Sequence, residues 1–410
     1  MIRAEKVTKI FGSDPKSAIP LLEQNKSKNE IRELTGQTVG VNNASFDIQR
    51  GEVFAIMGLS GCGKSTLIRC INRIIEPTSG RVVLTHPERG ELEITELSDE
   101  ELRVLRKQNV SMVFQHFALL PHRTVLSNVA YGLEIQGRGR KERHEAAQGV
   151  LEMVGLGPWG QSYPSELSGG MQQRVGLARA LATEAEVLLM DEPFSALDPL
   201  IKVDMQQELT RIQHELHRTI LFITHDLDEA MRIGDHIAIM EDGRIVQIGS
   251  PEQILVNPRT EYVARFVEHA DPTGVITAGT IALPLDSTDF VSSDERDGVT
   301  YFHRHDQPRV RLGQDRSGRL REVLVDDRDV PVRRLEEILD HEQRSASTDR
   351  WAMVLTCDEN VVLRHILRGR LYSTLPVIVI NGDGRIRGVI DDPELIKGIL
   401  EKRGNEAVFS

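Results

Sequence analysis

The sequence has little that would suit nucleic-acid binding or an oxidising compartment. Aromatic residues make up only 4% of the 410 residues, and the formal net charge is −12. Non-specific binding of DNA or RNA needs a basic field that releases counterions, so this balance argues against a nucleic-acid partner. The three cysteines, Cys62, Cys70 and Cys357, show no paired metal-ligand spacing, and so sparse a count fits a reducing compartment.

The sequence also lacks a long apolar run. None approaches the roughly 20 residues that an α-helix needs to cross a bilayer. The opening residues, MIRAEKVTKIFG, lack the apolar stretch of a secretory signal. We therefore expect a cytoplasmic protein, and any membrane role must come through a partner.

What is present is enough material for two or three domains. Apolar residues make up 40% of the chain, and short apolar runs alternate with longer helical patterns through its first two thirds. This alternation is typical of an α/β fold with a mainly parallel sheet. A polar stretch at about 13–38 is predicted to be a helical insertion. Residues 272–300, rich in Thr, Gly, Asp and Ser, are predicted to link a first domain at 1–271 to a second at 301–410.

A glycine-rich loop with a lysine is the strongest chemical signal. It follows an apolar strand predicted over 53–57 and precedes a helix. Its glycines allow successive backbone N–H groups to curl around phosphates, and the positive end of the helix favours the same anion. Lys64 is expected to pair with the β- and γ-phosphate oxygens of ATP, and Ser65 to place its hydroxyl on Mg²⁺. The predicted nucleotide-binding residues here are Gly58, Leu59, Ser60, Gly61, Cys62, Gly63, Lys64, Ser65 and Thr66.

Two carboxylates follow a buried strand predicted at 187–190. Carboxylates at such a strand end are costly unless a cation or water receives them. Asp191 is therefore the expected partner of Mg²⁺, and Glu192 the expected general base that orients or deprotonates the attacking water. Together with the loop, this pair is still compatible with kinases, GTPases and helicases.

The stretch LSGGMQQR narrows the class. Ser168, Gly169 and Gly170 precede a helix predicted over 171–183, so they present N–H groups and a helix dipole to an anion. Because the chain already has one phosphate-binding loop, a second such site is best explained by a nucleotide held by a neighbour. We therefore expect a head-to-tail dimer with two shared nucleotides.

This stretch is the signature of the ABC ATPases, which the chain resembles through nearly all of residues 1–270. It is similar in particular to the ATPase subunit of glycine betaine/proline (quaternary amine) importers, whose insertion also ends like TGQTVGVNNASF. The segments that carry the likeness are MGLSGCGKSTLIRCINRIIEPTSGRV, VFQHFALLPHRTVLSNVAYG, ELSGGMQQRVGLARALA, LLMDEPFSALDPLIKVDMQQEL and ITHDLDEAMRIGDHIAIM. The resemblance implies a P-loop ATPase domain with a mixed sheet and a helical subdomain.

The resemblance also implies roles within the chain's own nucleotide site. Phe11 stands where the family stacks an aromatic ring on adenine. Gln115 is expected to contact Mg²⁺ and the attacking water. His225 is expected to hydrogen-bond the γ-phosphate and to assist Glu192.

Further implied roles concern assembly. Ser168, Gly169 and Gly170 are expected to bind the γ-phosphate of ATP held by the other subunit of a homodimer, and Asp198 lies in the loop that links the two sites. The other implied partners are a transmembrane permease and, indirectly, a substrate-binding protein. The implied location is the cytoplasmic face of the inner or cell membrane.

Residues 277–403 resemble a tandem pair of cystathionine-β-synthase (CBS) domains, an α+β accessory of some of these importers. DRSGRLREVLVDD from Asp315 and NGDGRIRGVIDD from Asn381 indicate an internal repeat, of which the second copy is clearer. In that family the pattern G-h-x-[ST]-x-x-D often holds an adenosine ribose. Here Asp391 stands at the hydroxyl position and Glu394 at the acid position, which disfavours nucleotide binding. Dimerisation and sensing of ionic strength both stay open.

The expected function is ATP-driven import of an osmoprotectant such as glycine betaine, choline or proline, with import of another small solute as the alternative. An ABC ATPase acting on nucleic acid or ribosomes is predicted to carry tandem cassettes, a coiled-coil insertion or basic surfaces, and this acidic, single-cassette sequence has none. A regulatory protein with a dead ATPase is disfavoured by the intact Lys64, Asp191, Glu192 and His225.

Overall fold

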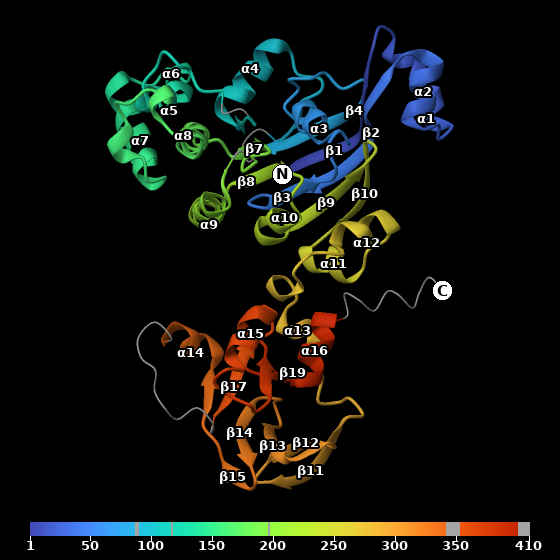
Figure 1. Cartoon of the computed structure of the whole chain (residues 1–410), viewed down its shortest axis with the longest axis vertical. Helices are drawn as coiled ribbons and strands as arrows, with labels where there is room; N and C mark the ends of the chain where they lie inside the picture. The colour runs from blue at the N-terminus through green and yellow to red at the C-terminus, as the bar shows by residue number, and fades with distance from the viewer. Residues whose placement is uncertain (87–89, 116–117, 196, 342–352, 401–410) are drawn as a thin grey trace. The chain divides into compact units, whose positions relative to one another are not determined.

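The computed structural model describes residues 1–410 apart from 87–89, 116–117, 196, 342–352 and 401–410. Two compact units divide the chain, Met1–Val267 and Glu268–Ser410 (Figure 1). Each unit has its own core and is described by itself.

A six-stranded mixed sheet forms the centre of unit 1, in the order β10-β9-β3-β8-β7-β6. The strands are β3 (Val53–Met57), β6 (Val110–Val113), β7 (Val187–Asp191), β8 (Thr219–Thr224), β9 (His236–Glu241) and β10 (Arg244–Gly249). All neighbours pair in parallel except β10, which returns from β9 through a tight turn at Asp242 and Gly243. Strands β3, β7 and β8 are buried along their whole length, as expected for parallel strands covered on both faces. This sheet carries the candidate site at its carboxyl edge.

A second, antiparallel sheet has the order β2-β1-β4-β5. It comprises β1 (Ile2–Phe11), β2 (Thr38–Ile48), β4 (Ser79–His86) and β5 (Gly90–Glu93). Helix α3 (Lys64–Ile71) lies between the two sheets, and its Leu67, Ile68 and Ile71 share one core with both. The first turn of α3 is therefore fixed from two sides.

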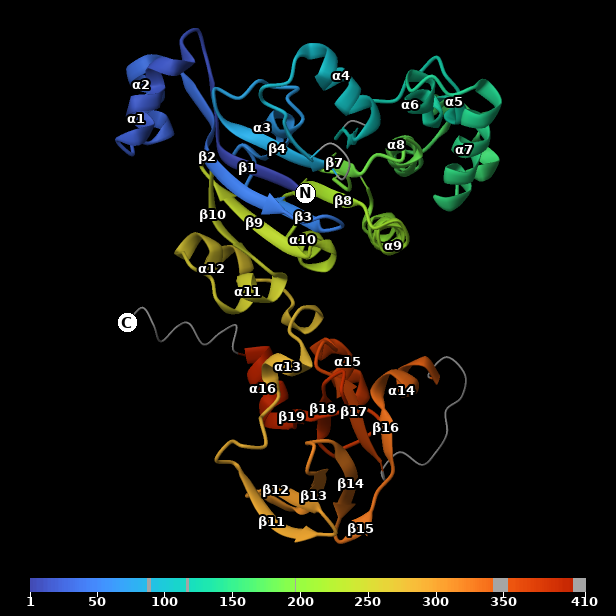
Figure 2. The same cartoon turned by 180° about the vertical axis from the view of Figure 1, so that it is seen from behind.

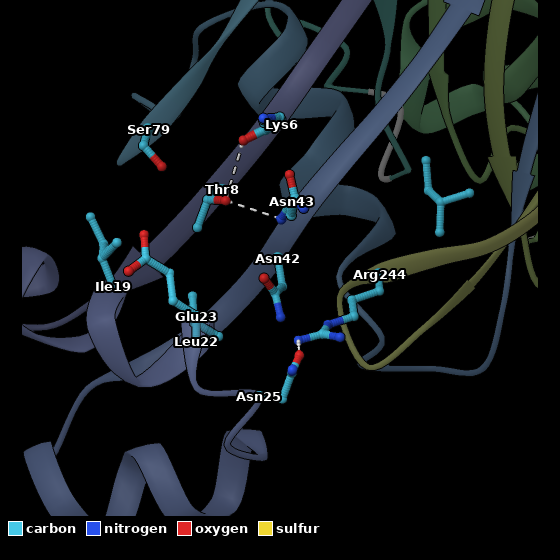
Figure 3. A pocket seen from close by; sticks show the side chains of 11 residues that line it. Lys6, Thr8, Ile19, Leu22, Glu23, Asn25, Asn42, Asn43, Ser79 and Arg244 are labelled. Carbon is cyan, nitrogen blue, oxygen red and sulfur yellow. Dashed lines mark hydrogen bonds between the residues drawn. The ribbon is translucent and has the colours of Figure 1, made fainter.

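Three short helices fill the predicted insertion between β1 and β2: η1 (Pro15–Ala18), α1 (Ile19–Glu23) and α2 (Lys28–Thr35). Ser27 and Glu30 form a reciprocal capping box at the start of α2, and Gly36 ends it in a left-handed conformation. Ile31 is buried in a small core with Ile10 of β1. A pocket of about 540 Å³ lies here, lined by apolar side chains and by polar side chains of β1, β2, β10 and α1. Within it, Arg244 points towards Asn25 (Figure 3).

The helical part of unit 1 lies at the opposite end of the unit from the insertion (Figures 1 and 2). It contains α5 (Val125–Val129), α6 (Tyr131–Ile135), α7 (Arg140–Met153), the turns η2 (Gly157–Trp159) and η3 (Pro164–Glu166), and α8 (Gly169–Ala182). These helices have a core of their own. Between them and β5 lies α4 (Asp99–Gln108), which begins with a reciprocal capping box of Ser98 and Glu101.

The remaining helices of unit 1 follow the strands of the main sheet in turn. They are α9 (Pro199–Leu216), α10 (Leu227–Ile233), α11 (Pro251–Val256) and α12 (Glu261–Val267). Helix α9 precedes β8 in the chain, and α10 packs against β3 and β8.

The described residues of unit 2 form two sheets. The first is antiparallel: β11 (Phe290–Arg296), β12 (Val299–Arg304), β13 (Gln307–Asp315), β14 (Leu320–Val325) and β15 (Arg328–Asp329). The second has the order β16 (Val332–Arg334), β17 (Val354–Asp358), β18 (Val377–Ile380) and β19 (Ile386–Ile390). The helical elements η4 (Pro272–Gly274), α13 (Ala278–Ile281), α14 (Leu335–His341), α15 (Leu363–Gly369) and α16 (Asp392–Leu400) complete the unit.

The linker predicted at 272–300 is corrected by the structure. Ala278 is fully buried in the core of unit 2, and Leu283 exchanges backbone hydrogen bonds with Val389. Strand β11 is also part of this stretch. The few apolar residues of the stretch suffice because distant segments supply the rest of the core, so a polar composition alone did not mark a linker.

The internal repeat is restricted to a hairpin. In both copies an Asx turn closes the hairpin: the Asp315 side chain accepts from the N–H of Arg319, and the Asn381 side chain accepts from the N–H of Arg385. The two turns lie side by side, since the N–H of Ile386 donates to the carbonyl of Gly318 at 2.9 Å. The second hairpin, β18-β19, lies within the order β17-α15-β18-β19-α16. The first hairpin, β13-β14, is instead preceded by the antiparallel strands β11 and β12.

Candidate functional site

The glycine-rich loop joins β3 to α3 as predicted. Its glycines at 58, 61 and 63 all have positive φ angles, which favour glycine over other residues. Gly63, at φ 113°, also has no room for a side chain, because a Cβ there would lie 2.2 Å from the carbonyl oxygen of Gly40 in β2. The sequence therefore bends into a tight loop directly before α3, the backbone conformation that a phosphate-binding loop needs.

Lys64 is buried, with only 4% of its surface exposed. Its Nζ donates to the carbonyl of Gly58 at 2.7 Å and to that of Leu59 at 3.1 Å. The ammonium group is thus folded over the loop, and its present partners are neutral oxygens. A phosphate would be a stronger partner for this charge.

Asp191, at the end of β7, is completely buried. Its Oδ1 accepts from the Ser65 hydroxyl at 2.9 Å, and its Oδ2 from Nη2 of Arg69 at 3.0 Å. Ser65 and Arg69 are one helical turn apart on α3, so both reach the same carboxylate. Arg69 was not predicted from the sequence, although its spacing from Ser65 is the signal that could have found it.

Glu192 follows directly and has a left-handed backbone, at φ 48°. Such strain in a residue other than glycine is concentrated at functional sites. Its Oε2 accepts from Nε2 of Gln115 at 3.1 Å and lies 3.4 Å from Nδ1 of His225. These three residues follow β6, β7 and β8, which are adjacent in the sheet, so their parallel carboxyl ends meet at one edge.

Two sets of contacts around the site were missed from the sequence. The hydroxyl of Tyr262 in α12 accepts from the N–H of Leu59 and donates to the carbonyl of Met240, each at 3.4 Å. Lys202 of α9 bonds both Asp226 and Glu229. No motif pointed to these residues, because their partners are close only in three dimensions.

Burial acts on this second group of charges. It raises the pKa of Glu229, which is almost fully enclosed. Burial also opposes ionisation of Asp226, but the hydrogen bond and charge of Lys202, together with the backbone N–H groups of Asp228 and Glu229, outweigh it and hold the pKa of Asp226 below its usual value. Lys202 therefore stabilises a carboxylate directly beside His225.

Phe11 lies at the end of β1 with 39% of its surface exposed. A Cβ added to Gly40 would lie 2.8 Å from the Phe11 ring and 3.2 Å from Cγ2 of Thr66. The ring and the start of α3 are thus neighbours across the Gly40 backbone. The long insertion after Phe11 does not remove it from the loop.

The signature residues lie elsewhere. Ser168 caps α8 by accepting from the N–H of Met171 at 3.3 Å, and the helix begins at Gly169, two residues before the predicted start. Ser168 and Gly169 are exposed, whereas Gly170 is buried against Ile201. Their exposed N–H groups are available to another molecule.

Asp198 is exposed and caps the start of α9, where its Oδ1 accepts from the N–H of Ile201 at 3.1 Å. The preceding residue of the predicted linking loop, Leu197, contacts the position of Gly170. Residue 196 of that loop lies outside the described residues.

Among the described residues, no helix is both long and apolar enough to cross a membrane.

Known proteins match most of this chain. The ABC transporter family matches residues 41–195. The glycine betaine/carnitine transport ATP-binding protein GbuA of Listeria monocytogenes is 46% identical over 395 residues, covering 95% of this chain and 95% of that protein. The glycine betaine/proline betaine transport system ATP-binding protein ProV of Escherichia coli is 54% identical over 274 residues, covering 67% of each.

A solved dimeric ATP-binding cassette in a post-hydrolysis state, bound to ADP and phosphate, is 31% identical with a TM-score of 0.52 and covers 61% of this chain and 99% of that one. The fold and the site together define an ATP-binding cassette, as predicted. The chain belongs to the ATP-binding proteins of ABC transporters, in the glycine betaine/proline betaine group. Unit 1 ends at Val267, so the likeness to the Listeria protein over 395 residues extends well into unit 2.

Proposed function

We propose that this chain hydrolyses ATP to energise the import of glycine betaine, proline or a related quaternary amine through a separate permease. One observation supports ATP hydrolysis: Gln115, Glu192 and His225 meet at one edge of the sheet. Asp191 and the phosphate loop that precedes Ser65 lie at the same edge. The solute class rests on the names of relatives that are 46% and 54% identical.

The chain's own groups support hydrolysis in the following way. Lys64 exchanges its two carbonyl partners for the β- and γ-phosphate oxygens. Glu192 takes up a proton from the attacking water, while Gln115 and His225 hold its carboxylate from two sides. His225 also donates to the γ-phosphate, and Phe11 stacks on the adenine.

Mg²⁺ suits the donors at this site. Ser65 offers a hydroxyl, Asp191 a carboxylate and Gln115 an amide oxygen, and Mg²⁺ prefers hard oxygen ligands and substrate phosphates. When bound, it would neutralise charge on the phosphates. Arg69 meanwhile provides Asp191 with a counter-charge from within the chain.

A homodimer would complete the site. Ser168 and Gly169 are exposed at the start of α8, and Gly170 follows them, so their N–H groups can bind the γ-phosphate of ATP held by the partner. Asp198, exposed at the start of α9, would connect the two sites. In this assembly each chain gives one half of two different ATP sites, at the cytoplasmic face of the membrane beside a permease that receives solute from a binding protein.

We also propose that unit 2 is the CBS-like accessory, acting in dimerisation or regulation. The acidic pair at the altered adenosine pattern already has partners within the chain. Arg370 lies 3.1 Å from Asp391, and Arg304 lies 2.9 Å from Glu394. This internal pairing weighs against nucleotide binding at that place.

The solute is tested by reconstitution with the co-purified permease and binding protein in vesicles. Glycine betaine or proline is expected to stimulate ATP hydrolysis severalfold, and an amino acid such as glutamine is not. Stimulation by another small solute alone would favour the alternative, an importer of different specificity.

A further inference from the structure

A partly buried ionic cluster joins α9 to α10 beside the candidate site. The Nζ of Lys202 lies 2.5 Å from Oδ2 of Asp226 and 2.6 Å from Oε1 of Glu229. Glu229 is only 3% exposed, and its other oxygen accepts from the hydroxyl of Thr224, which is also buried. Both carboxylates of the cluster therefore depend on one ammonium group for their charge balance.

The cluster holds His225 from both sides along the chain. Thr224 ends β8, and Asp226 caps α10 by accepting from the N–H groups of Asp228 and Glu229. The N–H of Asp226 also donates to the Thr224 hydroxyl at 3.0 Å. The His225 side chain itself is 57% exposed, so its position depends chiefly on this backbone.

The other end of the cluster is attached to the loop of Asp198. Lys202 lies in the first turn of α9, and its N–H donates to the carbonyl of Asp198 at 2.9 Å. Asp198 in turn caps the helix through Ile201. A shift of the Asp198 loop would thus move Lys202, and with it the segment that carries His225.

We propose that Lys202 is a positioning residue that ties the Asp198 loop to the backbone of His225. His225 then lies beside Glu192 only when the first turn of α9 keeps its position against Asp226 and Glu229. Lys202 acts through His225 and touches no nucleotide. The inference rests on the proposed role of His225 in ATP hydrolysis.

The test is a double-mutant cycle on ATP turnover in the purified full chain. Lys202→Met keeps the apolar stem and removes the charge. It is expected to lower kcat at least about tenfold, because a misplacement of about 1 Å can lower a rate by about 10²-fold. The Kd for ATP should stay within about twofold, since Lys64 and its loop are separate from the cluster.

Two further variants separate positioning from general stability. Lys202→Arg should restore most of the turnover, because a guanidinium can bridge both carboxylates. Arg211→Met is the matched control. Arg211 is exposed on the same helix and pairs there with Glu208 and Glu215. It should leave kcat unchanged.

In the combined variant Lys202→Met/His225→Ala, kcat should equal that of His225→Ala alone, because the lysine acts through the histidine. If Lys202→Met does not fold, Glu229→Gln takes its place in the cycle, since the amide oxygen still accepts from Thr224. Losses that simply multiply, or an unchanged kcat in the lysine variant, would overturn the inference while leaving the role of His225 intact. A full kcat in His225→Ala would instead overturn the proposed role of His225 and this inference with it.

Discussion

Arg69 neutralises a carboxylate that burial has separated from water. Asp191 is completely buried, and its charged partner is the guanidinium of Arg69 at 3.0 Å. The Arg69 side chain is itself 40% exposed. Leaving a buried charge without a partner is costly. The arginine therefore matters most when no metal ion is near.

Arg69→Ala is expected to lower the free energy of unfolding by about 1–3 kcal/mol in the absence of Mg²⁺ and nucleotide. The loss should shrink when Mg²⁺ and ADP are present, because another cation then faces Asp191. Chemical denaturation under both conditions measures it, with Arg265→Ala as control, whose pair with Glu261 is 75% exposed on both sides. An equal loss under both conditions would contradict this account.

The motif residues of the site could be predicted from the sequence, because glycine spacing, a lysine and paired carboxylates at strand ends follow from phosphate and metal chemistry. Arg69, Lys202 and Tyr262 could not. Each contacts residues far along the chain: Arg69 reaches Asp191, and Tyr262 reaches Leu59. Such contacts depend on tertiary packing rather than on local pattern.

At the scale of elements, strands buried on both faces were predictable. The apolar strand predicted over 53–57 matches β3. The stretch 272–300 was wrongly predicted as a linker because its polar composition hides a few core residues, of which Ala278 is one. The antiparallel strands β11 and β12 lacked a clear alternation that would have marked them.

The phosphate loop offers a matched test of its backbone. Gly61→Ala places a Cβ in open space and is strained only by its φ of 80°, which should cost about 1 kcal/mol of stability. Gly63→Ala adds a clash with the carbonyl of Gly40 and should cost more than about 2 kcal/mol. Thermal or chemical unfolding of the nucleotide-free protein compares them, and equal losses would show that the close approach of β2 does not shape the loop.

At the scale of the whole molecule, we propose that one chain carries halves of two sites. The start of α8 is exposed at Ser168 and Gly169, so its N–H groups can bind the ATP of a partner. Gly169→Asp should leave the single chain folded, since a Cβ there meets nothing within 4 Å. Its carboxylate should repel the partner's γ-phosphate and abolish ATP-driven dimerisation, measured by light scattering with and without ATP. A variant that still dimerises with ATP would refute the shared site.

The most direct measurement is ATP turnover and ATP-dependent dimerisation of Glu192→Gln in the full chain. The account predicts a fall in turnover of at least about 10²-fold, because the base is lost, while Gln115 and His225 keep the site assembled. The same variant should bind ATP and remain as a stable dimer. Turnover close to that of the unaltered chain would contradict the role assigned to Glu192, and with it the mechanism proposed for the site.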